Sequence, residues 1–159
     1  MQNLSQRAIA EIEASRDYFN RSTRNLTEDH STFAPAPGMM TAAQQVAHAA
    51  QTVDWFFEGA FRPQGFNMDF EGMAKETNDY TSLAKARAWF EKAIAHAKEV
   101  IADKSDAELL EPLPPGIMGG APRFAVIGSL TDHTAHHRGA LTVYARLKGV
   151  VPPMPYMET

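Results

Sequence analysis

The segment 131–141, with the sequence TDHTAHHRGAL, carries the strongest chemical signal in the chain. If it forms a helix, His133 and His137 lie one turn apart on the same face. Imidazoles at positions i and i+4 can each direct a ring nitrogen at one ion, and this spacing therefore recurs in helical metal sites. The spacing predicts that His133 and His137 are metal ligands.

The phase of the helix favours this pair over His136. At 100° per residue, His133 and His137 fall within about 40° of a single apolar line, whereas His136 projects about 100° away from His137. The apolar line consists of Val126, Leu130, Leu141 and Tyr144. The alternative is that both are core histidines bonded to other side chains. Two imidazoles in adjacent turns of an apolar stripe must each find a partner or repel one another when protonated, so we expect a metal.

Thr134 stands where the metalloprotease motif H-E-x-x-H has its glutamate base. Peptide hydrolysis by that mechanism is therefore not predicted.

A catalytic metal needs at least a third protein ligand. His48 is the best candidate, because it lies mid-helix beside Thr52 and Trp55 rather than among aliphatic side chains. From the residues alone, His48 is as well interpreted as a half-exposed helical histidine as it is as a metal ligand. His96 is expected to serve packing or an interface, and His30 lies in a predicted loop.

The acidic residues give no clear general base. Asp54 and Glu58 share a predicted helix with His48 but do not project with it, and Asp132 points away from the neighbouring His133. Solvated carboxylates are the expected outcome, and the catalytic residues stay unassigned.

Four helical patterns must position these residues. They run from about Asn3 to Leu26, Thr41 to Ala60, Thr81 to Asp103, and Pro122 to Lys148. The first two begin with capping-box pairs, Asn3 with Gln6 and Thr41 with Gln44, and Gly149 ends the last. Without strands or internal repeats, this pattern predicts an all-α four-helix bundle that forms a single domain over residues 1–159.

Two long irregular segments, 61–80 and 104–121, interrupt the helices and are predicted to be loops after the second and third helix. The first carries Phe66, Phe70 and Tyr80, and we predict that it covers an apolar pocket at the metal. The alternative is that it fills a gap in the bundle. The helix from Thr41 has an uncharged reverse face, so we expect it to be covered on more than one side.

Composition excludes several functions. The 159 residues are 44% apolar and carry 15 Lys and Arg against 19 Asp and Glu, a net charge of −4. A chain with this net charge lacks the excess of basic residues that is typical of a nucleic-acid-binding protein. The absence of cysteine excludes disulfides, thiolate metal sites and cysteine nucleophiles. Without a signal-peptide pattern or an apolar run of roughly 18 residues, we expect a cytoplasmic protein that is not inserted in a membrane.

A histidine in the second helix, followed by a terminal helix with H-x-x-x-H-R-G, resembles the DinB (damage-inducible) family, also called YfiT-like. The matching residues are His48 and the stretch from His133 to Gly139, and the resemblance covers essentially the whole chain. Ala140 departs from the glutamine that many members have after the glycine. The resemblance implies a four-helix bundle in which His48, His133 and His137 hold a divalent metal. Zinc or nickel is the expected ion, with iron or manganese as alternatives.

The resemblance also implies a metal-dependent hydrolase, or a transferase that uses a low-molecular-weight thiol such as bacillithiol or mycothiol. Three imidazoles leave at least one open position on a divalent ion, as catalytic zinc sites do. A non-catalytic metal-binding stress protein and a structural or interaction bundle remain the alternatives. The family is commonly dimeric, and Trp55 and Trp89 lie beyond the stripes that one core requires. We therefore predict a homodimer.

Overall fold

A computed structural model describes residues 2–114 and 116–157. Its long helices are α1 (Leu4–Thr23), α2 (Ala42–Phe61), α4 (Leu83–Ala102) and α6 (Ala125–Leu147). Shorter helices are η1 (Glu28–His30), α3 (Phe70–Asn78), α5 (Asp106–Leu110) and η2 (Met118–Gly120). The described residues form no strand, only one isolated bridge between Pro112 and Pro122. The all-α four-helix bundle is confirmed.

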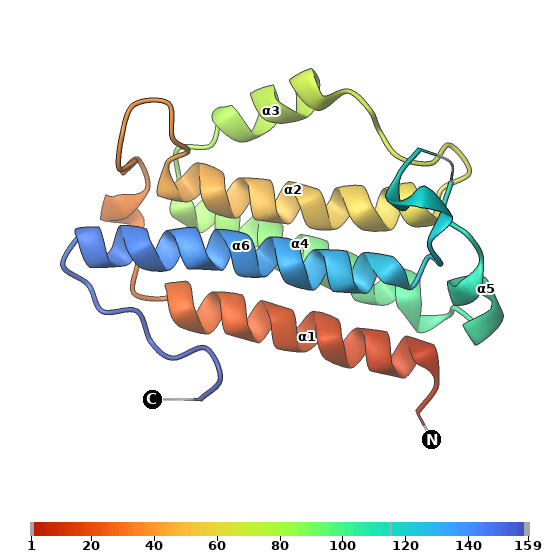
Figure 1. Ribbon diagram of the computed structural model, residues 1–159. Helices are drawn as coiled ribbons and strands as arrows, with labels where there is room; N and C mark the ends of the chain where they lie inside the picture. Colours follow the sequence, from red (N-terminus) through yellow and green to blue (C-terminus); the bar gives the residue numbers. More distant parts are fainter. Residues whose placement is uncertain (1, 115, 158–159) are drawn as a thin grey trace.

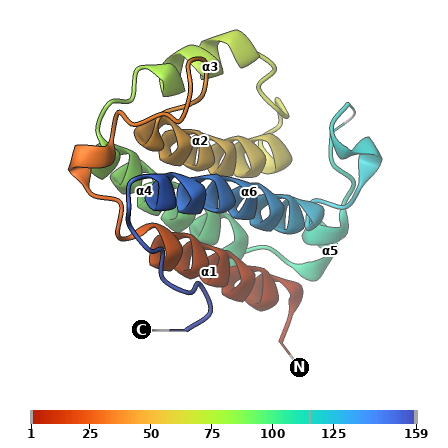
Figure 2. The same ribbon diagram turned by 60° about the vertical axis from the view of Figure 1, so that its left-hand side comes forward.

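The four long helices lie side by side as a bundle (Figures 1 and 2). α2 packs against α4 and α6, and α1 packs against the same two helices from the other side. The metal-ligand candidates therefore lie on neighbouring helices, because α2 carries His48 and α6 carries the other two.

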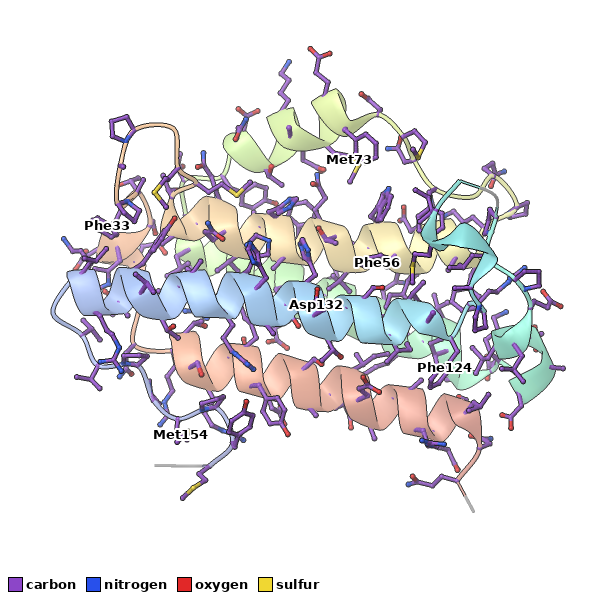
Figure 3. All side chains as sticks on the ribbon, viewed as in Figure 1. Phe33, Phe56, Met73, Phe124, Asp132 and Met154 are labelled. Atoms are coloured by element: carbon purple, nitrogen blue, oxygen red, sulfur yellow. The ribbon has the colours of Figure 1, made fainter. Side chains whose placement is uncertain are left out.

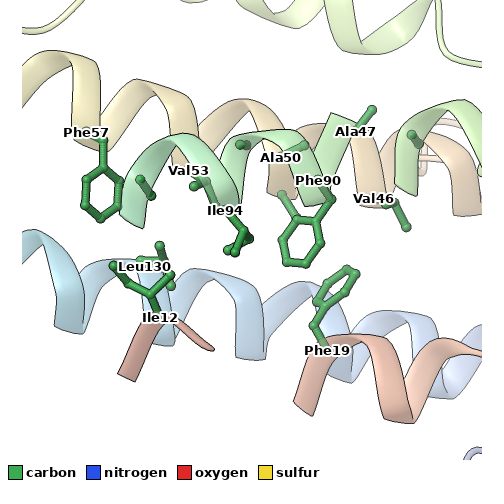
Figure 4. Close-up of a cluster of buried hydrophobic side chains, with 14 of the residues drawn as sticks. Ile12, Phe19, Val46, Ala47, Ala50, Val53, Phe57, Phe90, Ile94 and Leu130 are labelled. Carbon is green, nitrogen blue, oxygen red and sulfur yellow. The ribbon is translucent and has the colours of Figure 1, made fainter. Parts of the chain in front are cut away.

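Apolar side chains from all four long helices close the core (Figure 4). The rings of Phe19 in α1 and Phe90 in α4 pack with their centroids 4.5 Å apart. Ile12, Ile94 and Leu130 extend this core along the bundle, each at most 1% exposed. Burial of such side chains contributes about 1.5–3 kcal/mol each relative to exposure, which fixes the helices that carry the site.

The helix starts follow the sequence signals closely. Both predicted capping boxes form, with Asn3 before α1 and Thr41 before α2. α1 ends at Thr23 rather than Leu26, because Arg87 of α4 donates to the backbone oxygen of Thr23 at 2.6 Å and Leu26 closes a turn onto the same oxygen. Gly149 adopts φ +76° after α6, as the predicted stop requires.

α6 begins at Ala125 rather than at Pro122. The backbone around Pro122 stays extended, because Arg123 N–H donates to the oxygen of Glu111 and Leu113 N–H donates to that of Ala121, both at 2.9 Å. These two bonds tie the chain before α6 to the segment that follows α5.

Two predicted loops contain helices. Segment 61–80 includes α3, in which only Thr77 is buried, and segment 104–121 includes α5, five residues long and capped by Ser105 with Glu108. A helix this exposed or this short shows no apolar period in its sequence. Among the described residues, no helix combines the length and apolar character that crossing a membrane requires.

Candidate metal centre

The bundle brings His48, His133 and His137 together at the interface of α2 and α6. One ring nitrogen from each lies within 4.8 Å of the other two. The centroid of the His48 ring lies 5.2 Å from that of His133 and 5.0 Å from that of His137. The ring centroids of His133 and His137 are 4.5 Å apart. Asp132, labelled midway along α6 in Figure 3, marks the level of the cluster along that helix.

The cluster is largely shielded from solvent, and one of its nitrogens has no protein partner. His137 is 4% exposed, and His48 and His133 are half-buried. The Nε2 atom of His133 is shielded from solvent and has no hydrogen-bond partner. Core histidines in a purely structural role are normally bonded, so the unpartnered nitrogen favours a binding role for His133. A metal ion would give the nitrogen a partner.

Burial makes all three imidazoles poor bases. It lowers the pKa of His137 to about 3, with further lowering from the neighbouring His133 and His48. Burial also lowers the pKa of His133 to about 4, again reinforced by His48. The pKa of His48 is lowered by burial, partly offset by an interaction with Gln51. Neutral imidazoles present free lone pairs at pH 7, the form that metal binding requires.

A chain of hydrogen bonds fixes the orientation of His137. Its Nδ1 lies 2.5 Å from Oε1 of Gln45, and Gln45 Nε2 donates to the Tyr144 hydroxyl at 3.3 Å. Tyr144 in turn donates to the backbone oxygen of Met40 at 2.9 Å. An amide oxygen accepts, so Nδ1 carries the proton and Nε2 is left for a metal. Sequence reasoning missed Gln45, although its place one turn before His48 was a usable signal.

The remaining histidines lie outside the cluster. His136 is exposed, with its ring edge-on to His137 at 5.0 Å. His30 accepts the Thr27 backbone N–H at 3.0 Å and so stabilises η1. His96 lines a different cavity with Phe57. The choice of His133 and His137 over His136 thus agrees with the geometry.

Two of the three carboxylates on α2 and α6 bond to other residues, and the third is exposed. Asp54 accepts the Trp89 indole N–H at 2.7 Å, and Glu58 pairs with Arg62 at 2.7 Å. Asp132 is exposed. These observations place none of the three carboxylates as a general base for the histidine cluster.

The aromatic residues of segment 61–80 gather on Trp55 rather than over the histidines. The ring centroids of Phe66 and Phe70 lie 4.7 and 6.3 Å from that of Trp55. Trp55 itself is about two helical turns from His48 along α2. Tyr80 stacks on Trp89 at 5.2 Å. The aromatic cover predicted for the metal pocket is therefore wrong in position, and these side chains cover α2 and α4.

α3 lies alongside α2, as Figure 1 shows, and two glutamines of α2 bond to it. Gln44 donates to the backbone oxygen of Asn78 at 2.8 Å, and Gln51 donates to that of Met73 at 2.9 Å. The prediction that α2 is covered on more than one side is confirmed. His48 lies between these two glutamines on the same helix.

Comparison with known proteins finds the same fold in other proteins. The YjoA protein of Bacillus subtilis is 25% identical over 146 residues, covering 91% of each chain. A DinB-like protein from Bacillus cereus has a similar structure, with a TM-score of 0.69, 20% identity, and coverage of 94% of this chain and 93% of the other. YfiT from Bacillus subtilis, described as a probable metal-dependent hydrolase with an unusual four-helix bundle topology, superposes with a TM-score of 0.71 at 14% identity, over 92% and 88% of the chains. The DinB superfamily model matches residues 11–141, and this chain belongs to that family.

Proposed function

We propose that this protein is a metal-dependent hydrolase in which His48, His133 and His137 hold one divalent cation. The observation that carries the proposal is the grouping of His48, His133 and His137, in which one ring nitrogen from each lies within 4.8 Å of the other two, together with the buried, unpartnered Nε2 of His133. The description of YfiT as a probable metal-dependent hydrolase supports the same reaction class.

The donor set fits a catalytic metal. Three imidazoles suit zinc, nickel or iron, and we propose zinc or nickel, with manganese a further candidate. A divalent cation with three protein ligands retains an open position, acts there as a Lewis acid and lowers the pKa of a water or thiol. This chain contributes the neutral imidazoles, and Gln45 accepts the Nδ1 proton of His137, which leaves its Nε2 free to bind the metal.

Thiol-dependent transfer is the second candidate. A low-molecular-weight thiol would then replace water as the nucleophile at the same open position, a role for which this chain has no cysteine of its own. The family resemblance supports this candidate, whereas the description of YfiT supports hydrolysis. We therefore place hydrolysis first.

The decisive experiment measures metal before activity. Purified protein is analysed for bound metals by mass spectrometry, together with His48→Ala, His133→Ala and His137→Ala. His136→Ala is the matched control, because it removes an exposed histidine from the same helix. We expect one metal per chain in the wild type and the control, and little in the other three. Equal metal in all five proteins would overturn the proposed ligands.

Activity then separates the remaining functions. Metal-loaded and chelator-treated proteins are screened against ester and amide substrates, and against electrophiles with bacillithiol or mycothiol. Metal-dependent turnover without a thiol supports the hydrolase, and turnover only with a thiol supports the transferase. Stoichiometric binding without turnover supports a metal-binding protein with no reaction.

We also propose that the chain forms a homodimer. Trp55 and Trp89 do not supply the apolar surface for it, because Phe66 packs on Trp55 and Tyr80 stacks on Trp89 within the chain. Large apolar side chains remain exposed elsewhere, among them Met68 at 57%, Phe70 at 56% and Leu147 at 60%. Contact between two copies would cover part of this surface.

A further inference from the structure

A second cavity, of about 190 Å³, lies between α2, α3 and α4, and none of the three histidines lines it. Both tryptophans of the chain line it. Its other lining residues are polar or acidic apart from one methionine: Gln51, Asp54, Glu58, Asn67, Met73 and Glu76. The wall thus combines two indoles with three carboxylates and contains no lysine or arginine.

The two indoles are held in place by their own hydrogen bonds. Trp55 Nε1 donates to the backbone oxygen of Asn67 at 2.7 Å, and Trp89 Nε1 donates to Oδ2 of Asp54 at 2.7 Å. Trp89 is further fixed by stacking on Tyr80. Side chains that are already fixed lose little entropy when a ligand binds, so the cavity is preorganised.

One acceptor in the wall has no hydrogen-bond partner. Gln51, only 5% exposed, has a buried Oε1 with no hydrogen-bond partner, while its Nε2 donates to Glu76 Oε2 at 2.7 Å. Asp54 uses Oδ2 for Trp89. Burial raises the pKa of Asp54, although Trp89, His96 and Lys92 act in the opposite direction. The charged form of Asp54 is therefore not fully compensated by its surroundings.

We propose that this cavity binds a small organic cation that carries an ammonium group on a short carbon chain. Indole faces attract such cations more strongly than other aromatic rings do, and desolvation strengthens the attraction. Asp54 and Glu76 supply the opposite charge, and the carbon chain packs on Met73 and the indoles. An inorganic cation would use the carboxylates but not the indoles, so the aromatic wall favours the organic ligand. This site stands independently of the proposed hydrolase.

The tryptophans give a direct readout, because the only two in the chain line the cavity. The full chain is titrated with butylammonium, putrescine or choline while the intrinsic fluorescence is recorded, and 1-butanol serves as the uncharged analogue. We expect a saturable change with at least one of the ammonium compounds and none with butanol. Sodium chloride at matched ionic strength excludes a general salt effect.

Asp54→Asn tests the charge while keeping an oxygen that accepts from Trp89. We expect its dissociation constant to rise at least tenfold. Glu71→Gln is the control, since Glu71 is exposed on α3 and does not line the cavity. If Asp54→Asn fails to fold by circular dichroism, Glu76→Gln replaces it. Equal binding by the variant and the wild type, equal effects of butanol and butylammonium, or no saturable change up to about 10 mM ligand would each overturn the proposal.

The titration is repeated after chelation, because Gln51 interacts with His48 as well as lining the cavity. Cation binding that persists in chelated protein agrees with an independent site. Cation binding that disappears with the metal would instead place the ligand at the histidine cluster and overturn the assignment to this cavity. Neither result depends on whether the protein is a hydrolase.

Discussion

The Nδ1 atom of His137 lies 2.5 Å from Oε1 of Gln45, so that a residue of α2 sets the tautomer of a residue of α6. Gln45 is itself oriented, because its Nε2 donates to Tyr144 at 3.3 Å. The partner of a metal-ligating histidine normally fixes both the ring orientation and the basicity of the ligand. Gln45 therefore belongs to the site although it presents no donor atom to the metal.

Replacing Gln45 with leucine should weaken metal binding about 10- to 100-fold, the usual cost of losing such a partner. His137 then loses the acceptor for its Nδ1 proton and can adopt the other tautomer. Calorimetric titration of chelated protein with zinc measures the change. Gln45→Glu keeps an acceptor at this position and should bind zinc more tightly than Gln45→Leu. Unchanged affinity in Gln45→Leu would mean that the hydrogen bond does not orient the ligand.

The stability of the metal-free protein should depend on pH in a defined direction. In the unfolded chain a histidine has a pKa of about 6.5, whereas burial lowers the pKa of His133 to about 4 and that of His137 to about 3. Between these values the unfolded state binds protons that the folded state does not. With respect to these two histidines, the free energy of unfolding is thus highest above about pH 6.5. It decreases progressively as the pH falls toward about 3.

Thermal melts of chelated protein at several pH values from 7 to 4 measure this loss. His133→Leu should show a smaller decrease in melting temperature over that range, because one of the buried histidines is gone. His136→Leu should retain the wild-type decrease, because His136 is exposed. A melting temperature that does not change with pH in the wild type would contradict the argument.

His133→Leu should also make the metal-free protein more stable at pH 7, by about 1 kcal/mol, since it removes a buried nitrogen that has no partner. The same variant should no longer gain stability when zinc is added. The substitution thus raises the stability of the metal-free protein but removes the stability that zinc adds. This combination is typical of a residue kept for binding rather than for packing. Denaturant titrations with and without zinc measure both. A metal-free variant less stable than the wild type would show that His133 is mainly a packing residue.

We predict a dimer in solution. Light scattering at micromolar concentration should give about twice the mass of one 17.5 kDa chain. Phe70→Ser tests whether α3 takes part, because Phe70 is 56% exposed at the start of that helix. A monomeric mass that is independent of concentration would rule out the dimer, and a dimeric Phe70→Ser would place the interface elsewhere.

The sequence alone predicts those parts of the site that depend on one helix. His133 and His137 follow from the phase of α6, because a helical period relates residues three and four positions apart. His48 does not follow in this way, since its place beside them arises from the packing of α2 on α6, and the residues alone left its role open. The family resemblance supplied this third position.

Other features depend on contacts that no local pattern contains. Gln45 gains its role only when α6 places His137 within 2.5 Å. α3 was missed because Thr77 is its only buried residue, so its sequence shows no apolar stripe. The predicted position of the aromatic cover, over the metal pocket, was wrong for a related reason. Three aromatic residues predict an apolar contact, but the packing of α2 selects Trp55 as the surface for two of them.

The contact between segment 61–80 and α2 can be tested at a single glycine. A Cβ atom built on Gly59 would lie 2.1 Å from Cδ1 of the Phe66 ring, so the two side chains cannot coexist in this arrangement. Gly59→Ala should displace Phe66 from Trp55 and lower the melting temperature. Gly128→Ala in α6 is the matched control, because its Cβ meets nothing within 4 Å, and it should stabilise the helix by about 0.5–1 kcal/mol. Zinc binding should be unchanged in both variants, because Phe66 packs on Trp55 and not on the histidines. A loss of zinc binding in Gly59→Ala alone would show that the segment shapes the metal site after all.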